Sequence, residues 1–554
     1  RIEARGLGKV VADAATGAPK TLLNNIDLAI LPGEFVGIFG TSGSGKSTLM
    51  DTLNGRRPGS QGAVLYNGTD LGRSLDMFRS VIGYVPQQDI VHRRITIRRA
   101  LEYTARLRLP QDTSATEIAG YIDRVLKQVG LYEKADQPID TPVPLSGGQL
   151  KRVSVAVELV SNPAVLFLDE PTSGLAAGTD RKMMQLFAAL AADRKTVICV
   201  THTLENIDAC HLVVVLFRGQ LVYFGPPDGV CEHFAIKRLS DVYETLETKP
   251  IEEWVRHYDQ STFRRDYIDR RLSATTAIPT TTVATAAARP GRSLFDWRQA
   301  GILTRRFADL VLADRRNLAI LLAQAPVIGV VVGLVFSIGD TITARAVAES
   351  QIAFMLVVAS VWFGCLNAAR EIVKELPIYA RERSVNLGIG PYLASKLLPL
   401  ALLCAIQCTT LLGAVSMFLT IPGSFMARVG ILFATGMAAS AMGLLVSAAV
   451  TTTDKAVAIV PILLIPQVIL SNAVVRLEGW SETIAKATVV AFWGFDGVKA
   501  TLADEVQQAK DLAGKALVPV VGSYQSDMLI IGAFTLVFLV ATLLALRQRD
   551  GTAA

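Results

Sequence analysis

Six long uncharged runs in the second half of the chain constrain its fold more than any other feature. Each holds 19 to 25 residues, and about 20 apolar residues suffice for a helix to cross a hydrocarbon core of roughly 30 Å. The runs are Leu318–Ser337, Gln351–Ala369, Leu397–Ile421, Val429–Val450, Ala456–Val475 and Met528–Leu546. Because a bilayer offers backbone groups no water, we expect an all-α domain of six membrane-spanning helices.

The first half of the chain has a different composition. The whole chain of 554 residues is 51% hydrophobic and 19% charged, against about 25% charged in ordinary soluble domains. The shortage of charge lies in the second half. Up to residue 235, short apolar strands such as Val165–Leu168 and Thr196–Val200 alternate with helical stretches, which predicts an α/β domain. The net charge of +6 is diluted over a long chain, so we expect no nucleic-acid partner.

These patterns divide the chain into four parts. We expect the α/β domain over 1–235 and a helical extension over 236–293, which ends in the Thr- and Ala-rich linker 273–292. We expect a basic amphipathic helix over 294–316, lying along the membrane surface; a packed cytosolic helix is the alternative. The six-helix membrane domain then fills 317–554, with a long external loop over 476–527.

Basic residues predict the orientation, since Lys and Arg are enriched in cytoplasmic loops. They gather in the loop 370–392, at Lys455 and at Arg547 and Arg549. The α/β domain and both ends of the chain are therefore expected in the cytoplasm, in a multi-pass protein of the plasma (inner) membrane. The six cysteines lack zinc-ligand spacing, so we expect reduced thiols. The chain begins with Arg1 rather than Met, and we expect it to be a fragment.

A phosphate-binding loop follows the first apolar strand of the α/β domain. Its pattern places backbone amides around the phosphates of a nucleotide, with Lys46 reaching the β- and γ-phosphates and Ser47 placed to bind Mg²⁺. The residues expected to bind nucleotide here are Gly40, Thr41, Ser42, Gly43, Ser44, Gly45, Lys46, Ser47 and Thr48.

Two carboxylates end the apolar strand that begins at Val165. Asp169 is expected to hold Mg²⁺ through water, and Glu170 to polarise the attacking water as a general base. A strand-end acidic pair without a catalytic role is the alternative reading of the same two residues. The neighbouring phosphate-binding motif favours the catalytic one.

A second Gly-rich turn, Leu145-Ser-Gly-Gly-Gln149, opens a helix. The backbone amides of Ser146, Gly147, Gly148 and Gln149 can hold a phosphate at the helix N-terminus. A chain that already has one phosphate cradle does not need another, so we expect this turn to close over ATP bound to a facing subunit. That implies a dimer.

The order of these motifs, together with Gln87 and His202, resembles the nucleotide-binding domain of an ABC transporter. The resemblance implies that Gln87 touches Mg²⁺ and that His202 contacts the γ-phosphate. With Glu170 they form the expected catalytic set, and Ser47, Gln87 and Asp169 the expected metal set. The ATP domain precedes the membrane domain, which resembles ABCG half-transporters of the type V exporter (ABC-2) class.

The resemblance extends to the actinobacterial branch in which phosphopeptide-binding FHA domains precede the ATP domain. It rests on the sequences of the segments Gly83–His92 and Trp493–Asp496. It implies FHA domains before Arg1, Ser/Thr kinases as partners, and export of lipid or glycolipid envelope components.

The sequence departs from the family in three places. Ala176 stands where the family has an aspartate that crosses the dimer interface, which puts the coupling of the two sites in doubt. No aromatic residue precedes Phe35 to stack on adenine, and Val10 or Val11 would supply a weaker apolar contact. The external loop has no cysteine.

The function implied is ATP-driven export by a homodimer, with ATP and Mg²⁺ as cofactors and membrane lipids around it. Half of an obligate heterodimer, or a phospho-regulated signalling or scaffold ATPase in the membrane, are the alternatives. In the membrane domain, Phe363, Asn367 and Ala473–Val475 are expected to line the substrate path, with ordinary helix packing as the other interpretation.

Overall fold

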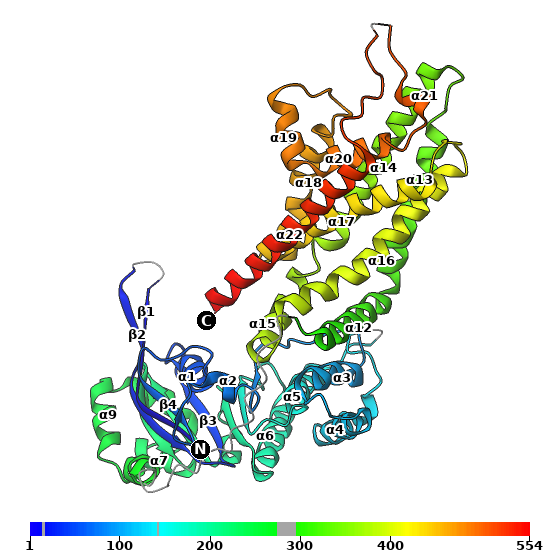
Figure 1. The fold of residues 1–554 in the computed structure, drawn as a ribbon. Coiled ribbons are helices and arrows are strands. Elements are labelled where there is room, and N and C mark those ends of the chain that lie inside the picture. Colours follow the sequence, from blue (N-terminus) through cyan, green and yellow to red (C-terminus); the bar gives the residue numbers. More distant parts are fainter. Residues whose placement is uncertain (14–16, 141–142, 274–294, 513, 554) are drawn as a thin grey trace. The chain divides into compact units, whose positions relative to one another are not determined.

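The computed structural model describes residues 1–13, 17–140, 143–273, 295–512 and 514–553. The chain divides into two compact units, with the boundary between Ser293 and Leu294. The first is an α/β domain and the second is built of helices (Figure 1). Apart from Ser273, the segment 273–292 that we expected as a linker lies outside the described residues.

A six-stranded sheet forms the centre of the first unit. Its order is β10-β9-β3-β8-β7-β6, and all neighbouring pairs are parallel except β10 with β9. Every residue of β8 and β9 is buried, as expected of a parallel sheet covered on both faces. The strands are β3 (Phe35–Gly40), β6 (Ile82–Val85), β7 (Val165–Asp169), β8 (Thr196–Val200), β9 (Leu212–Phe217) and β10 (Gln220–Gly225).

Parallel strands end at the same edge of a sheet, and ligands of α/β domains bind there. The segments that follow β3, β6, β7 and β8 hold the predicted phosphate loop, Gln87, Glu170 and His202 respectively. The sheet topology therefore brings together motifs that are more than 160 residues apart in the chain.

A second, antiparallel sheet has the order β2-β1-β4-β5. Its long hairpin joins β1 (Ile2–Ala12) to β2 (Pro19–Ile30), and β4 (Gln61–Tyr66) and β5 (Thr69–Asp70) complete it. Figure 1 shows α3 (Ile97–Arg108), α4 (Ala115–Gln128) and α5 (Gly147–Leu159) as a helical group beside the strands. The other principal helices are α1 (Lys46–Leu53), α6 (Ala177–Ala192), α7 (Asp228–Phe234), α8 (Val242–Glu247) and α9 (Ile251–Asp259).

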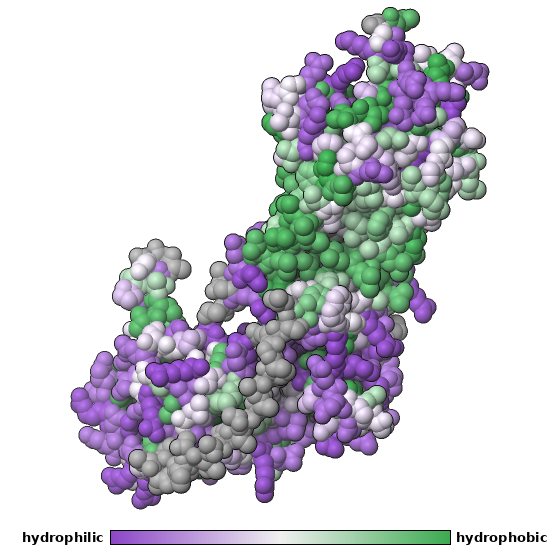
Figure 2. Space-filling view, viewed as in Figure 1, coloured by the Kyte–Doolittle hydropathy of each residue, from purple (hydrophilic) through white to green (hydrophobic). Residues whose placement is uncertain are grey.

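The second unit contains five helices, within its described residues, that are long and apolar enough to cross a membrane. They are α13 (Arg315–Val335), α14 (Ile342–Ala368), α16 (Ile389–Ser416), α17 (Phe425–Ala449) and α22 (Tyr524–Ala553). Figure 2 shows a band of hydrophobic residues around the middle of this unit, with hydrophilic residues at both its ends. This confirms an α/β domain followed by an apolar helical domain.

The fifth predicted span, Ala456–Val475, is shorter in the structure. Helix α18 (Thr453–Ile469) has 17 residues. Beyond it Asn472 adopts a left-handed backbone with φ of 65°, and its side-chain oxygen accepts a hydrogen bond from the Leu477 amide at 2.9 Å. This turn ends the helix at Ile469 while the sequence is still apolar, so the fifth predicted helix forms but ends before Val475.

The segment 476–527, expected as an external loop, contains helices α19 (Trp480–Thr488), α20 (Val490–Lys499) and α21 (Asp504–Gln507). Helix α20 buries Phe492, Phe495 and Val498 in the same apolar core as α14 and α17. Its polar end is anchored too, because Asp496 accepts the amides of Val521 and Gly522 at 2.9 and 2.8 Å. The segment is therefore a packed part of the helical unit.

Helix α12 (Trp297–Ala313) forms within the predicted amphipathic segment 294–316, but Arg306 does not lie on its exposed face. The Arg306 guanidinium is buried and makes two hydrogen bonds to Glu382 of α15 (Leu376–Val385), at 2.5 and 2.9 Å. The neighbouring Phe307 ring lies 4.2 Å from the ammonium of Lys396 on α16. The spacing of the arginines in this helix does not show which of them is buried, so the burial of Arg306 was not predicted.

Two residues expected to line a substrate path are packed inside the helical unit. Phe363 is 2% exposed and belongs to its apolar core. The Asn367 amide donates to Gln407 at 2.7 Å, and Gln407 donates to the Leu321 carbonyl at 2.7 Å, which joins α14, α16 and α13. Both residues thus follow the helix-packing interpretation, while Val474 and Val475 are more than half exposed.

Candidate functional site

The phosphate-binding loop wraps around the N-terminus of α1. Gly40, Gly43 and Gly45 have φ values of 156°, 76° and 95°. A Cβ atom at Gly40 would lie 2.1 Å from the Leu216 carbonyl oxygen, and one at Gly45 2.8 Å from the Leu22 carbonyl oxygen. The loop can therefore take this shape only with glycine, which leaves its amides free to surround a phosphate.

Two polar side chains of the loop, Lys46 and Ser44, lie beside the backbone of Gly40. The Lys46 ammonium donates to the carbonyls of Gly40 and Thr41, at 2.9 Å each. Burial lowers the pKa of Lys46, against the opposing charge of Glu170. The Ser44 hydroxyl is buried and has no hydrogen-bond partner among the described residues. A cradle that needs glycine and a buried unpaired hydroxyl both fit a bound phosphate group.

The three predicted catalytic residues meet at Glu170. The Gln87 amide donates to Glu170 Oε2 at 2.7 Å, and His202 Nε2 lies 3.0 Å from the same oxygen. Glu170 itself has a left-handed backbone, with φ of 48°. For a residue with a side chain this conformation costs about 1–3 kcal/mol and is found most often at functional sites.

Asp169, the predicted metal ligand, is held by a residue that sequence reasoning missed. The Tyr84 hydroxyl donates to Asp169 Oδ2 at 3.2 Å, and the Arg56 guanidinium stacks over the Tyr84 ring at 4.1 Å. Burial raises the pKa of Asp169, and the Tyr84 hydrogen bond lowers it in opposition. Tyr84 lies in the segment Gly83–His92 on which the resemblance rests, so its position was visible but its contact with Asp169 was not.

The predicted metal set offers hard oxygen donors, which Mg²⁺ prefers. Ser47 lies in the first turn of α1, Asp169 at the end of β7, and Gln87 beyond β6. Within the described residues no group of three or more His, Cys, Asp or Glu side chains could hold a metal alone. The remaining ligands of a Mg²⁺ ion at this site would come from nucleotide phosphates and water.

The Ser146–Gln149 turn caps α5. The Ser146 hydroxyl accepts the Gln149 amide at 3.4 Å, and Gln149 accepts the Ser146 amide at 3.1 Å. Gly148 packs under Thr179, because a Cβ atom there would lie 2.5 Å from Thr179 Cγ2. Within the described chain no hydrogen bond or ion pair joins this turn to the phosphate-binding loop.

Ala176, the departure from the family pattern, is the N-cap residue of α6 and provides no side-chain cap. The carboxylate nearest in the sequence, Asp180, accepts a hydrogen bond from the Asn206 side chain at 2.5 Å. It therefore does not take the place of the missing aspartate.

The fold and this site define a P-loop ATPase domain joined to an apolar helical domain. Comparison with known proteins agrees. Residues 23–173 match the ABC transporter family model and residues 298–502 the ABC-2 type transporter model. The chain therefore consists of an ABC transporter ATPase domain followed by an ABC-2 type membrane domain, in the ABCG-like order.

Two relatives match along most of the chain. The ABC transporter ATP-binding/permease protein Rv1747 of Mycobacterium tuberculosis is 30% identical over 87% of this chain and 56% of its own length. ABC transporter G family member 7 of Arabidopsis thaliana is 28% identical over 88% of this chain and 72% of its own. The chain thus spans little more than half of the mycobacterial relative.

Among solved structures, the dimeric post-hydrolysis state of the ATP-binding cassette MJ0796, bound to ADP and Pi, is similar to the first unit. It is 28% identical and covers 41% of this chain and 99% of its own, with a TM-score of 0.37.

Proposed function

We propose that this chain is one half of a homodimeric, ATP-driven exporter of lipid or glycolipid components in the plasma (inner) membrane. The convergence of Gln87 and His202 on Glu170, beside the phosphate-binding loop, carries the proposal. A carboxylate held by an amide and an imidazole is placed to orient and polarise a water molecule. The apolar helical domain lies on the same chain, so ATP hydrolysis can be coupled to transport across the membrane.

The residues of the first unit have distinct roles in this proposal. The amides of Gly40–Thr48 and the Lys46 ammonium bind the phosphates of ATP, and Ser47, Asp169 and Gln87 hold Mg²⁺. When bound, Mg²⁺ neutralises charge on the transferred phosphoryl group. Glu170 orients and polarises the attacking water, and His202, whose Nε2 already faces Glu170, donates to the γ-phosphate. The strained Glu170 backbone keeps the carboxylate aimed at the site.

A second copy of the chain completes each site. The capping box uses the amides of Ser146 and Gln149, which leaves the Ser146 hydroxyl proton and the first-turn amides of Gly147 and Gly148 to donate to a phosphate. No contact within the described chain joins these groups to the chain's own phosphate loop. Two copies would bind two ATP molecules, each between Gly40–Ser47 of one subunit and Ser146–Gln149 of the other. Closure requires that ATP bind the closed dimer more tightly than the open one.

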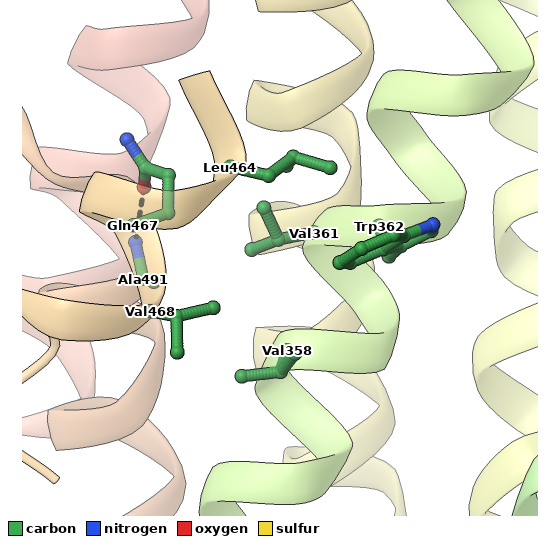
Figure 3. A pocket seen from close by; sticks show the side chains of 7 residues that line it. All are labelled: Val358, Val361, Trp362, Leu464, Gln467, Val468 and Ala491. Atoms are coloured by element: carbon green, nitrogen blue, oxygen red, sulfur yellow. Dashed lines mark hydrogen bonds between the residues drawn. The ribbon is translucent and has the colours of Figure 1, made fainter. Parts of the chain in front are cut away.

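The apolar helical unit supports a lipid-like cargo. A small hollow of about 10 Å³ lies between α14, α18 and α20 (Figure 3). Its lining is formed by Val358, Val361, Trp362, Leu464, Gln467, Val468 and Ala491. The one polar side chain among them, Gln467, already accepts the Ala491 amide at 3.0 Å, so the walls of this part of the helical unit are apolar, although the hollow itself is no larger than a water molecule. The resemblance of Gly83–His92 and Trp493–Asp496 to the FHA-linked branch supports Ser/Thr kinases as regulators.

The test is ATP hydrolysis and lipid export by the protein in reconstituted vesicles. Fractionated envelope lipids should stimulate hydrolysis, and Glu170→Gln should abolish both hydrolysis and export while ATP still binds. Hydrolysis that no lipid fraction stimulates, with no lipid moved across the bilayer, would favour a signalling ATPase. Turnover near the parent rate in Glu170→Gln would show that the catalytic assignment is wrong.

A further inference from the structure

Helix α5, which presents the Ser146–Gln149 turn, is tied to the segment that carries Gln87. Lys151 lies in the second turn of α5 and is 6% exposed. Its ammonium donates to the Gln87 main-chain carbonyl and lies 3.4 Å from Asp89 Oδ1. Ser154, one turn further along α5, is 3% exposed and donates to the same Asp89 oxygen at 2.9 Å.

These contacts connect two groups that serve different ATP molecules in the proposed dimer. The Gln87 side chain reaches Glu170 at 2.7 Å and so belongs to the subunit's own site. Ser146 and Gly147 are exposed at the other end of the same α5 segment and serve the site of the facing subunit. Lys151 follows Ser146 by five positions, a little more than one helical turn, so a displacement of one end of this turn moves the other.

We propose that Lys151 is a positioning residue that couples the two ATP sites, by fixing the Gln87 main chain to the helix that binds the partner's nucleotide. This inference rests on the proposed dimer. It supplies a route for coupling that does not need the carboxylate missing at Ala176. Movement of Gln87 as its own site fills is passed through Lys151 to α5, and so to the γ-phosphate held by Ser146.

The chemistry of the contact favours this role over packing alone. A buried ammonium is stabilised only when it is paired and hydrogen-bonded, and here both partners lie on the Gln87–Asp89 segment. An apolar side chain of equal length would fill the space without holding that segment. Lys151 therefore makes the position of Gln87 depend on the position of α5, which an apolar contact would do only weakly.

The experiment compares Lys151→Met with Lys151→Arg and Asp89→Asn in the full chain, with Lys127→Met on the exposed face of α4 as the matched control. Each is also made in the Glu170→Gln background, where ATP traps the closed dimer. The measurements are the Hill coefficient for ATP in hydrolysis, the ATP concentration that half-closes the trapped dimer, and ATP affinity for the open protein. Thermal unfolding and gel filtration verify that each variant is folded.

For Lys151→Met we expect a Hill coefficient that falls toward 1 and half-closure at an ATP concentration at least about tenfold higher, as a lost charged hydrogen bond implies. ATP affinity for the open protein stays at the parent value, Lys151→Arg restores most of the coupling, and Lys127→Met behaves as the parent. The effects of Lys151→Met and Asp89→Asn should be non-additive in a double-mutant cycle.

Two outcomes overturn the inference, and they can be told apart. If Glu170→Gln never closes with ATP, the proposed dimer fails and the inference fails with it. If that dimer closes and a folded Lys151→Met protein keeps the parent Hill coefficient and half-closure concentration, the dimer stands and Lys151 is only a packing residue. Should Lys151→Met not fold, the same reading is made on Asp89→Asn, which removes the charge partner without emptying the space.

Discussion

The crossing of α14 and α17 gives a sharp prediction, because it depends on one missing methyl group. A Cβ atom at Gly364 would lie 2.0 Å from the Gly436 carbonyl oxygen. Ordinary van der Waals contact begins at 3.4 Å, so the two backbones would have to separate by about 1.4 Å. Neither atom belongs to a side chain that could rotate away.

The expected magnitude follows from three effects. Overpacking costs up to about 3 kcal/mol where nothing can yield. The separation also breaks the hydrogen bond from Ser360 to the Leu432 carbonyl, 2.6 Å long and worth about 1 kcal/mol, whereas alanine favours the helix over glycine by about 1 kcal/mol. Gly364→Ala should therefore destabilise the protein by about 3 kcal/mol, a fall in Tm of roughly 6–12 °C.

The assay is thermal unfolding of the detergent-solubilised full chain, followed by tryptophan fluorescence. Gly413→Ala on α16 is the matched control, because a Cβ atom there meets nothing within 4 Å; its Tm should stay level or rise. Equal shifts in the two variants, or a stabilised Gly364→Ala, would refute the close-packed crossing.

Three further predictions concern the first unit. Tyr84→Phe keeps the ring under Arg56 but loses the hydrogen bond to Asp169, so half-maximal hydrolysis should need several-fold more Mg²⁺ while ATP binding without metal is unchanged. The control is Tyr243→Phe, because the buried Tyr243 hydroxyl has no partner among the described residues. An unshifted Mg²⁺ titration in Tyr84→Phe counts against a positioning role for Tyr84. Burial, aided by the charge of His257, lowers the pKa of His233 from 6.5 to about 4. The stability that neutral His233 contributes is therefore present above pH 6.5 and is lost as pH falls toward 4, by about 3 kcal/mol in all. Hydrogen exchange in α7 should show this pH dependence and His233→Phe should flatten it, whereas an equal slope in both proteins would exclude His233 as the cause. Ala176→Asp should change the Hill coefficient for ATP if this loop contributes to coupling, and an unchanged coefficient would leave the route through Lys151.

Motifs whose chemistry fixes their spacing were predictable from the sequence. A phosphate loop needs glycine at Gly40 and Gly45 because a Cβ atom would clash with a carbonyl oxygen, so the positions of its glycines predict its backbone conformation. The small residues Gly436 and Gly443 of α17 lie close against α14 and its neighbours, as small residues at helix crossings commonly do.

Features set by tertiary contacts were not predictable. Nothing in the apolar run to Val475 shows that Asn472 takes a left-handed turn. The burial of α20 depends on its packing against α14, α17 and α22, which the sequence does not specify. Arg306 looks like any other arginine of an amphipathic helix until Glu382 is brought beside it. Phe363 reads equally as a cavity wall or as a core residue, and only the packing of α14 decides between them.

The central claim is that the phosphate loop of one subunit faces the Ser146–Gln149 turn of the other. Thiol-specific cross-linking of a Ser42→Cys subunit to a Ser146→Cys subunit, both carrying Glu170→Gln, tests it directly, because both serines are exposed. The account predicts a mixed dimer that forms only with ATP and Mg²⁺, and little product from either variant alone. Cross-linking that is independent of ATP, or that joins Ser146→Cys to itself, would contradict the account.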